Sequence, residues 1–142
     1  EANSVKAGSD RVRLYPGAAA ALQDLHTNPR FKETKIAVAS STTEGGWAKK
    51  CLSLLEVAPS VKVSDVLSYA EIYNSNKARH FAALKKQSGL PYSEMLFFDD
   101  CTYGNNCADV ERGCPGVVTV ETPDGMTHDR WVHGLEKFAA SR

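Results

Sequence analysis

The chain has 142 residues, of which 42% are hydrophobic and 24% charged, an ordinary composition for a globular protein with a core of its own. Lysine plus arginine and aspartate plus glutamate each number 17, and this zero net charge argues against nucleic acid or an anionic membrane as the main partner. The sequence also lacks an apolar run of the roughly 20 residues that a membrane span needs, and its first ten residues hold no apolar signal-peptide centre.

In the first half of the chain, short apolar runs alternate with helical patterns. Residues 11–15 alternate polar and apolar side chains until Pro16, which suits the first turn of a helix over the alanine-rich segment that follows. KIAVAS, residues 35–40, predicts a buried strand because it is short, apolar and rich in small and β-branched side chains. STTE, residues 41–44, has the spacing of a capping box, and we expect its helix to continue through WAKKCLSLLEV, residues 47–57.

The second half repeats this alternation. Residues 63–73 predict a turn followed by a short strand, and residues 76–89 predict a helix with lysines near its end and a capping glycine. MLFF, residues 95–98, predicts a second buried strand. The remaining predicted elements are a short helix at 105–113, a strand at 116–120 and a last helix at 128–140.

This order of elements predicts an α/β fold. Strands separated by helices imply crossover connections and hence a parallel sheet. Continuous apolar runs, rather than alternating ones, indicate strands covered by helices on both faces. Because no linker or repeat interrupts the pattern, we expect one domain over residues 1–142 with a three-layer, Rossmann-like architecture.

The cysteines bear on the compartment. Cys51, Cys101, Cys107 and Cys114 form no CxxC pair and lie in no histidine pattern typical of zinc. A chain with this much apolar sequence also needs no disulfide framework. We therefore expect reduced thiols and a cytoplasmic location.

Polar residues follow two of the predicted strands at the edge where open α/β sheets bind ligands. Asp99 and Asp100 end the MLFF strand, and two adjacent carboxylates repel each other unless a cation lies close. Oxygen ligands alone favour Mg²⁺, which binds one or two carboxylates together with phosphate and water. The competing interpretation, equally weighted on this stretch alone, is a solvated turn or a helix cap.

Ser40 and Lys77 are the other candidates. The Ser40 hydroxyl suits either a phosphate oxygen or the cap of the next helix. Lys77 lies just inside a predicted helix start, where a cation is unfavourable unless an anion lies close. A lysine that reaches into solvent is the simpler alternative. His80, on the same helix, is expected on the surface or in the packing.

The order of these candidates resembles the haloacid dehalogenase (HAD) superfamily of phosphohydrolases. LYPGAAAAL, AVASSTTE, EIYNSNKARHFAAL, LPYSEMLFFDD and GLEKFA are similar to the eukaryotic magnesium-dependent phosphatases with a small or absent cap. The resemblance implies a HAD-like fold, with Ser40 as the phosphate-binding hydroxyl of the second motif and Lys77 as the third-motif lysine. It implies that Asp100 ligates Mg²⁺ with support from Asp99. Ser41, where the family often has arginine, would complete the phosphate-binding group.

One departure from the family is serious. The family's first motif is DxDxT, whose leading aspartate forms an aspartyl-phosphate while the second acts as general acid and base. No DxD occurs in the 142 residues. We expect that the chain begins inside a flap, with residues 1–14 as its tail, and that the first strand is missing. Such a fragment would be inactive alone, less stable and prone to aggregate.

The expected function is thus that of a Mg²⁺-dependent phosphomonoester hydrolase that acts through an aspartyl-phosphate, with the nucleophile absent from these residues. The resemblance implies a sugar phosphate or a phosphotyrosine protein as substrate, and a monomer. Two alternatives remain at this point. One is a non-catalytic α/β module, or pseudophosphatase, that binds an anion or a protein. The other is a receiver-type phospho-acceptor domain, which the position of Lys77 along the chain disfavours.

Overall fold

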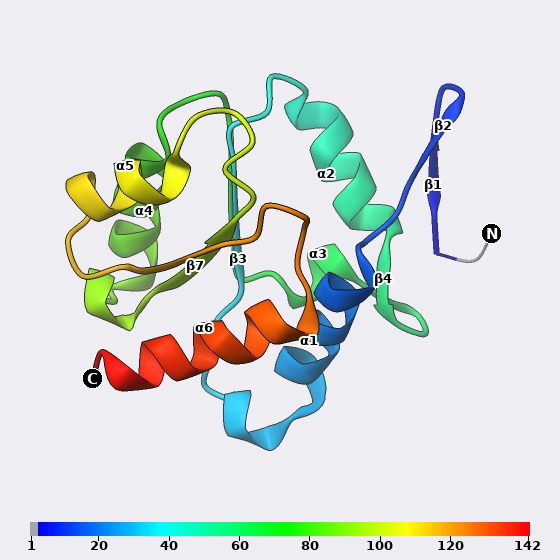
Figure 1. Ribbon diagram of the computed structural model, residues 1–142. Coiled ribbons are helices and arrows are strands. Elements are labelled where there is room, and N and C mark those ends of the chain that lie inside the picture. Colours follow the sequence, from blue (N-terminus) through cyan, green and yellow to red (C-terminus); the bar gives the residue numbers. More distant parts are fainter. Residues whose placement is uncertain (1–2) are drawn as a thin grey trace.

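The computed structural model describes residues 3–142 and shows helices packed on short parallel strands (Figure 1). The helices are α1 (Pro16–Thr27), α2 (Gly45–Leu54), α3 (Val63–Val66), α4 (Lys77–Ser88), α5 (Asn106–Gly113) and α6 (His128–Ala140). The strands are β1 (Val5–Ala7), β2 (Asp10–Val12), β3 (Ala37–Ser40), β4 (Glu56–Ala58), β5 (Val61–Lys62), β6 (Tyr69–Ile72), β7 (Leu96–Asp99) and β8 (Val118–Glu121). Over residues 3–142, no helix has both the length and the apolar character to cross a membrane.

Several helix ends follow the sequence signals. Pro16 opens α1 as predicted. In α4 the Asn76 side chain accepts a hydrogen bond from the Ala78 N–H, and Gly89 ends the helix with a φ of 72°, a left-handed conformation that glycine adopts without strain. The α6 helix covers the predicted residues, 128–140. Local chemistry therefore accounts for these boundaries.

The capping-box prediction for α2 is wrong. The N-cap is Glu44, which makes no side-chain cap bond. The Thr42 hydroxyl accepts the Glu44 N–H at 3.0 Å, but Thr42 lies two residues before the N-cap and so does not cap the helix. The helix also ends at Leu54, because the next residues leave it to form the β4–β5 hairpin. The segment 63–73 contains the predicted strand, β6, preceded by the short helix α3 rather than a simple turn.

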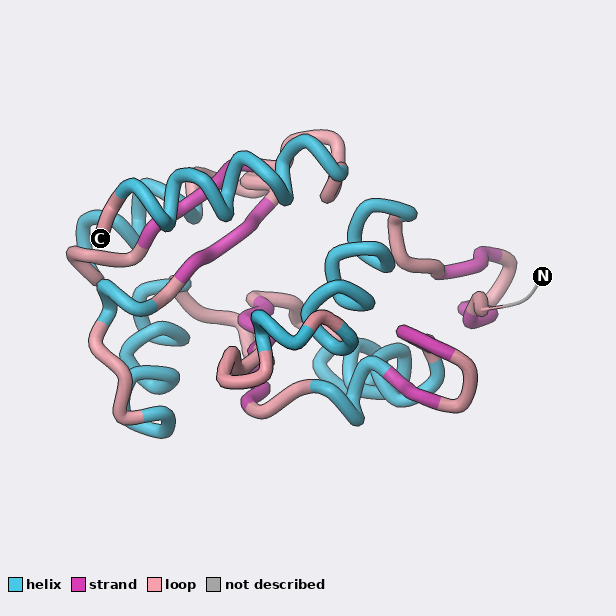
Figure 2. The backbone as a smooth tube through the Cα atoms, turned by 90° about the horizontal axis from the view of Figure 1, so that it is seen from below, coloured by secondary structure: helices cyan, strands magenta, loops and turns pink. Residues whose placement is uncertain are grey.

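The parallel pairing is confirmed, but the strands do not join into one sheet. Among the described residues, β3 pairs only with β6 and β7 only with β8, both in parallel register. The β1–β2 and β4–β5 pairs are separate antiparallel hairpins. Figure 2 shows the strands in distinct groups instead of one continuous layer. The single sheet expected from sequence is therefore divided, with β3 and β7 each keeping one open edge.

An apolar cavity of about 640 Å³, here called the interstrand cavity, is lined by both β3 and β7. The Ser40 carbonyl accepts from the Tyr73 N–H just after β6, so the backbone groups of Ser40 face β6. Because these groups alternate in direction along a strand, the backbone N–H and C=O groups of Ala37 and Ala39 point away from β6. The Asp99 carbonyl likewise accepts from Thr122 beyond β8, so the backbone groups of Leu96 and Phe98 point away from β8. The open edges of both strand pairs therefore lie along this cavity.

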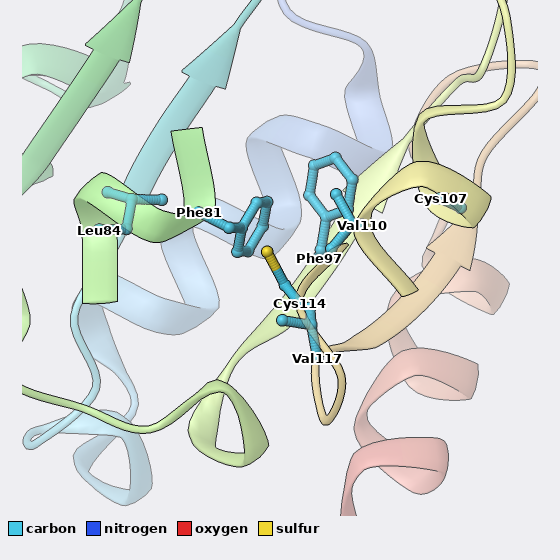
Figure 3. Close-up of a cluster of buried hydrophobic side chains, with 7 residues drawn as sticks. All are labelled: Phe81, Leu84, Phe97, Cys107, Val110, Cys114 and Val117. Carbon is cyan, nitrogen blue, oxygen red and sulfur yellow. The ribbon is translucent and has the colours of Figure 1, made fainter. Parts of the chain in front are cut away.

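Helices α1 and α6 cover one side of the interstrand cavity. The Trp131 indole N–H donates to Asp24 at 3.0 Å and ties α6 to α1, while its ring lies 5.8 Å from the Phe98 ring. Gly134 lets α6 approach β7, because a Cβ at that position would overlap the Phe98 ring. The buried cluster beside β7 is packed from α4 and α5 (Figure 3) and consists of Phe81, Leu84, Phe97, Cys107, Val110, Cys114 and Val117.

Candidate active site

The carboxyl ends of β3 and β7 meet at one lysine. Lys77 is the first residue of α4 and only 6% exposed. Its ammonium group donates to the Ala39 carbonyl at 2.6 Å and to the Asp99 carboxylate at 3.0 Å, and lies 5.6 Å from the Phe97 ring centre. The lysine thus bridges the two strand pairs across the end of the interstrand cavity. We call Lys77, Asp99 and the residues bonded to them the lysine corner.

Asp99 is held from three directions. Besides Lys77, its carboxylate accepts from the Cys101 N–H at 2.8 Å and from the Asn106 amide at 3.1 Å. Burial raises the pKa of this carboxyl, but the hydrogen bonds from Cys101, Lys77 and Asn106 together with the lysine charge outweigh it, so the pKa lies below its ordinary value. Asp99 is therefore ionised at neutral pH and orients Lys77.

Asp100 has the opposite environment. It is exposed, and one of its oxygens accepts from the Thr102 N–H at 3.1 Å in the turn after β7. Cys101 adopts a φ of 54°, which turns the chain sharply between the two acids and the loop. The two adjacent carboxylates therefore do not face each other, because Asp99 points inward to Lys77 and Asp100 is exposed just after the end of β7.

The chemistry of Asp100 suits a hard cation. A carboxylate oxygen exposed beside a lysine-bridged strand end is a Mg²⁺ ligand type, and Mg²⁺ completes its shell with water and substrate phosphate. Within residues 3–142, no group of three or more histidine, cysteine, aspartate or glutamate side chains could enclose a metal ion. The donor set thus fits a weakly held, substrate-assisted Mg²⁺ and not a closed structural metal.

The two serines after β3 are used differently. The Ser40 hydroxyl oxygen accepts the Thr42 N–H at 3.3 Å, so its own hydrogen stays free to donate to a ligand. The Ser41 hydroxyl donates to the Ser75 carbonyl at 2.7 Å, which commits its only hydrogen. The two hydroxyl groups therefore differ, because that of Ser40 accepts a hydrogen bond and that of Ser41 donates one within the chain.

Two residues of this region were not assigned to the site from the sequence, although His80 was expected on the surface or in the packing. Asn106 reaches Asp99 from the start of α5, and an asparagine at a helix start after an acidic strand end is ordinarily explained by capping alone. His80 is fully buried, with both ring nitrogens near backbone carbonyls. A histidine one turn after Lys77 was the available signal, but it is equally typical of simple packing.

Comparisons with known proteins show the family of the chain. The acid phosphatase family model matches residues 2–141. Human magnesium-dependent phosphatase 1 is 32% identical over 131 residues, 92% of this chain and 66% of that protein. A HAD-like hydrolase superfamily protein of Schizosaccharomyces pombe is 33% identical over 92 residues, 63% of this chain and 51% of that protein. The chain thus spans about two thirds or less of the length of these curated relatives.

A solved structure supports the fold. The N-terminal part of the protein BF1531 from Bacteroides fragilis, described as containing a phosphatase domain complexed with Mg, superposes with a TM-score of 0.62. It is 22% identical and covers 89% of this chain and 32% of its own. With the family match over nearly every residue, the chain belongs to the acid phosphatase family, among the magnesium-dependent phosphatases of the HAD superfamily that its motifs predicted.

Proposed function

We propose that this chain carries the phosphate-binding half of a Mg²⁺-dependent phosphomonoester hydrolase. The observation that supports this most is the lysine corner. A buried ammonium group that bridges the ends of β3 and β7, with an ionised aspartate behind it, is a fixed positive charge at the edge where α/β folds bind ligands. Such preorganised charge stabilises a phosphoryl group during transfer.

Each residue has a proposed role. Ser40 donates its free hydroxyl hydrogen to one phosphoryl oxygen, and Ser41 contributes its N–H. Lys77 neutralises charge on the phosphoryl group, held in place by Asp99. Asp100 is the proposed metal ligand, with Asp99 as its support and not a direct ligand, since both oxygens of Asp99 already accept hydrogen bonds. Mg²⁺ supplies charge neutralisation to the substrate.

The nucleophile is proposed to enter through the interstrand cavity. The 142 residues contain no Asp-x-Asp, yet the open edges of β3 and β7 face an apolar cavity that ends at Lys77. An extended apolar segment in that cavity could pair with both edges and deliver a carboxylate beside the lysine corner. This carboxylate would attack phosphorus and expel the alcohol of the substrate, giving an aspartyl-phosphate that water would hydrolyse to inorganic phosphate and the free carboxylate.

The finer assignments follow from the family resemblance. We propose that the substrate is a sugar phosphate or a phosphotyrosine protein and that residues 1–142 act as one monomeric, cytoplasmic domain. A pseudophosphatase that binds an anion without turnover is the second candidate. It is favoured by one observation: Lys77 and Asp99 form an ion pair at 3.0 Å, so part of the lysine charge is balanced within the chain.

Phosphate binding tests the proposal. The chain is titrated with inorganic phosphate at fixed Mg²⁺ and followed by the amide NMR signals of Thr42 and Lys77. We expect Mg²⁺-dependent shifts that Asp100→Asn abolishes and that Asp124→Asn, at another exposed acid, leaves intact. Binding that ignores both Mg²⁺ and Asp100→Asn would contradict the assigned site.

A further inference from the structure

His80 is a buried polar side chain that the proposed mechanism does not use. It lies one turn after Lys77 on α4, and its side chain has no exposed surface. Its Nε2 atom lies 2.9 Å from the Ser40 carbonyl oxygen and 2.9 Å from the Tyr73 carbonyl oxygen. Its Nδ1 atom lies 3.1 Å from the Asn76 carbonyl oxygen.

The partners of Nε2 decide what that atom carries. Carbonyl oxygens only accept hydrogen bonds. An Nε2 atom without a hydrogen would therefore lie against two acceptors and could bond to neither. Nδ1 faces one carbonyl oxygen and Nε2 faces two, so a hydrogen on Nε2 satisfies more of these contacts, and we assign the hydrogen to Nε2, shared between Ser40 and Tyr73. The Tyr73 ring stacks on the imidazole at 4.3 Å and 8°, which fixes the plane in which this N–H points.

This hydrogen bond joins the ends of two strands to one helix. Ser40 is the last residue of β3 and Tyr73 directly follows β6, while His80 belongs to α4. The Ser40 carbonyl also accepts the Tyr73 N–H at 3.0 Å. Nearby, the Ser41 hydroxyl donates to the Ser75 carbonyl at 2.7 Å, so the segments after β3 and β6 are bonded to each other at several points.

We propose that His80 is a positioning residue, whose Nε2–H clamps the Ser40 and Tyr73 carbonyls and thereby fixes the Ser40 hydroxyl relative to Lys77. The role of Ser40 rests on the proposed function, but the clamp does not. Loss of the clamp leaves the Ser40 carbonyl with its Tyr73 bond alone. The segments 40–42 and 73–76 then loosen while the distant β7–β8 pair keeps its own hydrogen bonds.

Two amide substitutions separate the clamp from simple packing. In His80→Gln the side-chain nitrogen occupies nearly the place of Nε2 and can donate to both carbonyls. In His80→Asn the nitrogen reaches only to the level of Nδ1. Both variants carry the same amide group, so their difference reports the Nε2 position.

Amide hydrogen exchange provides the measurement. We expect the Tyr73 amide, bonded to Ser40, to exchange about tenfold faster in His80→Asn than in His80→Gln, as for the loss of one buried hydrogen bond. The Val118 amide, bonded to Met95 in the other strand pair, serves as the internal control and should exchange alike in both. Equal rates at Tyr73 in the two variants, or equal acceleration at Val118, would overturn the clamp.

Two further readouts complete the test. Long-range proton–nitrogen NMR of the unaltered chain should show hydrogen on Nε2, and a bare Nε2 would refute the proposal even if His80→Asn failed to fold.

Inorganic phosphate with Mg²⁺ should bind severalfold more weakly to His80→Asn than to His80→Gln. Equal phosphate affinity in the two would show that the clamp does not position Ser40. Absence of phosphate binding in the unaltered chain would refute the proposed function, and the exchange rates would still decide the clamp.

Discussion

The lysine corner and the interstrand cavity lie next to each other, but they differ in how far their polar groups are paired. In the corner, every charge has partners: Lys77 contacts Ala39 and Asp99, and Asp99 is held again by Cys101 and Asn106. Over residues 3–142, no buried side-chain nitrogen or oxygen lacks a hydrogen bond. In the cavity, by contrast, two strand edges face apolar space. The polar site is thus complete locally, whereas the sheet that should support it is divided.

This contrast has a physical cause. Ionic contacts at the corner join residues near the ends of β3, α4 and β7, so they form whenever those ends meet. Sheet pairing needs a strand beside a strand, and β3 and β7 each find a partner only on their outer side in the described residues. The charge arrangement proposed to bind phosphate therefore forms independently of the element proposed to carry the nucleophile.

The largest stability effect is expected at the corner. Lys77→Met leaves the ionised Asp99 buried without its cation, and breaking a buried pair in this way costs about 3–5 kcal/mol. Urea unfolding measures it, with Lys49→Met at an exposed helical lysine as control. A loss below about 1 kcal/mol would mean that the corner is not held by this pair.

A proline pair tests the open edge of β3. The backbone N–H of Val38 faces β6 and that of Ala37 faces the cavity. Val38→Pro therefore removes a ladder donor and should cost about 1–3 kcal/mol, while Ala37→Pro should cost clearly less. Unfolding curves of the two variants give the comparison. Equal destabilisation would indicate that the cavity-facing edge of β3 is already engaged.

The pH dependence should follow Asp99. Because its pKa in the folded state lies below the ordinary value of 3.8, the folded state binds fewer protons than the unfolded state, and this contribution to stability is complete above that value. It is lost as the pH falls through the folded-state pKa. Unfolding measured across acid pH in the presence of a chelator should show this loss in the parent chain and a smaller one in Asp99→Asn.

The smallest effect on the free energy of unfolding is expected at Asp100. Asp100 is exposed, so Asp100→Asn should change the free energy of unfolding by no more than about 0.5 kcal/mol while removing Mg²⁺ dependence of phosphate binding. Thermal unfolding beside the phosphate titration separates the two effects. A large stability loss would assign Asp100 to the structural corner instead.

The sequence predicted what depends on local patterns. Apolar runs gave β3 and β7, and Asn76 and Gly89 gave the ends of α4, because these signals act over a few residues. The division of the sheet could not be predicted, since strand order depends on contacts between distant segments. Ser41 illustrates the same limit: its bond to Ser75 spans 34 residues and is invisible in the motif.

The partner of the first of the two adjacent carboxylates also depends on a contact between residues that are distant in sequence. Adjacent in sequence, Asp99 and Asp100 looked like a pair that needs one cation between them. Successive side chains at the end of β7 point in different directions, so Asp99 pairs with Lys77 while Asp100 stays exposed. The anion that Lys77 was expected to need at its helix start is Asp99, and the role of Asp100 as a Mg²⁺ ligand stays a prediction.

The most direct test of the central claim is turnover. The chain is joined, ahead of its first residue, to an apolar strand that ends in Asp-x-Asp-x-Thr and is assayed with an aryl phosphate and Mg²⁺. We expect hydrolysis that requires the leading aspartate and falls by about 10²–10³-fold in Lys77→Met. Turnover that Asp100→Ala or Lys77→Met leaves unchanged would contradict it.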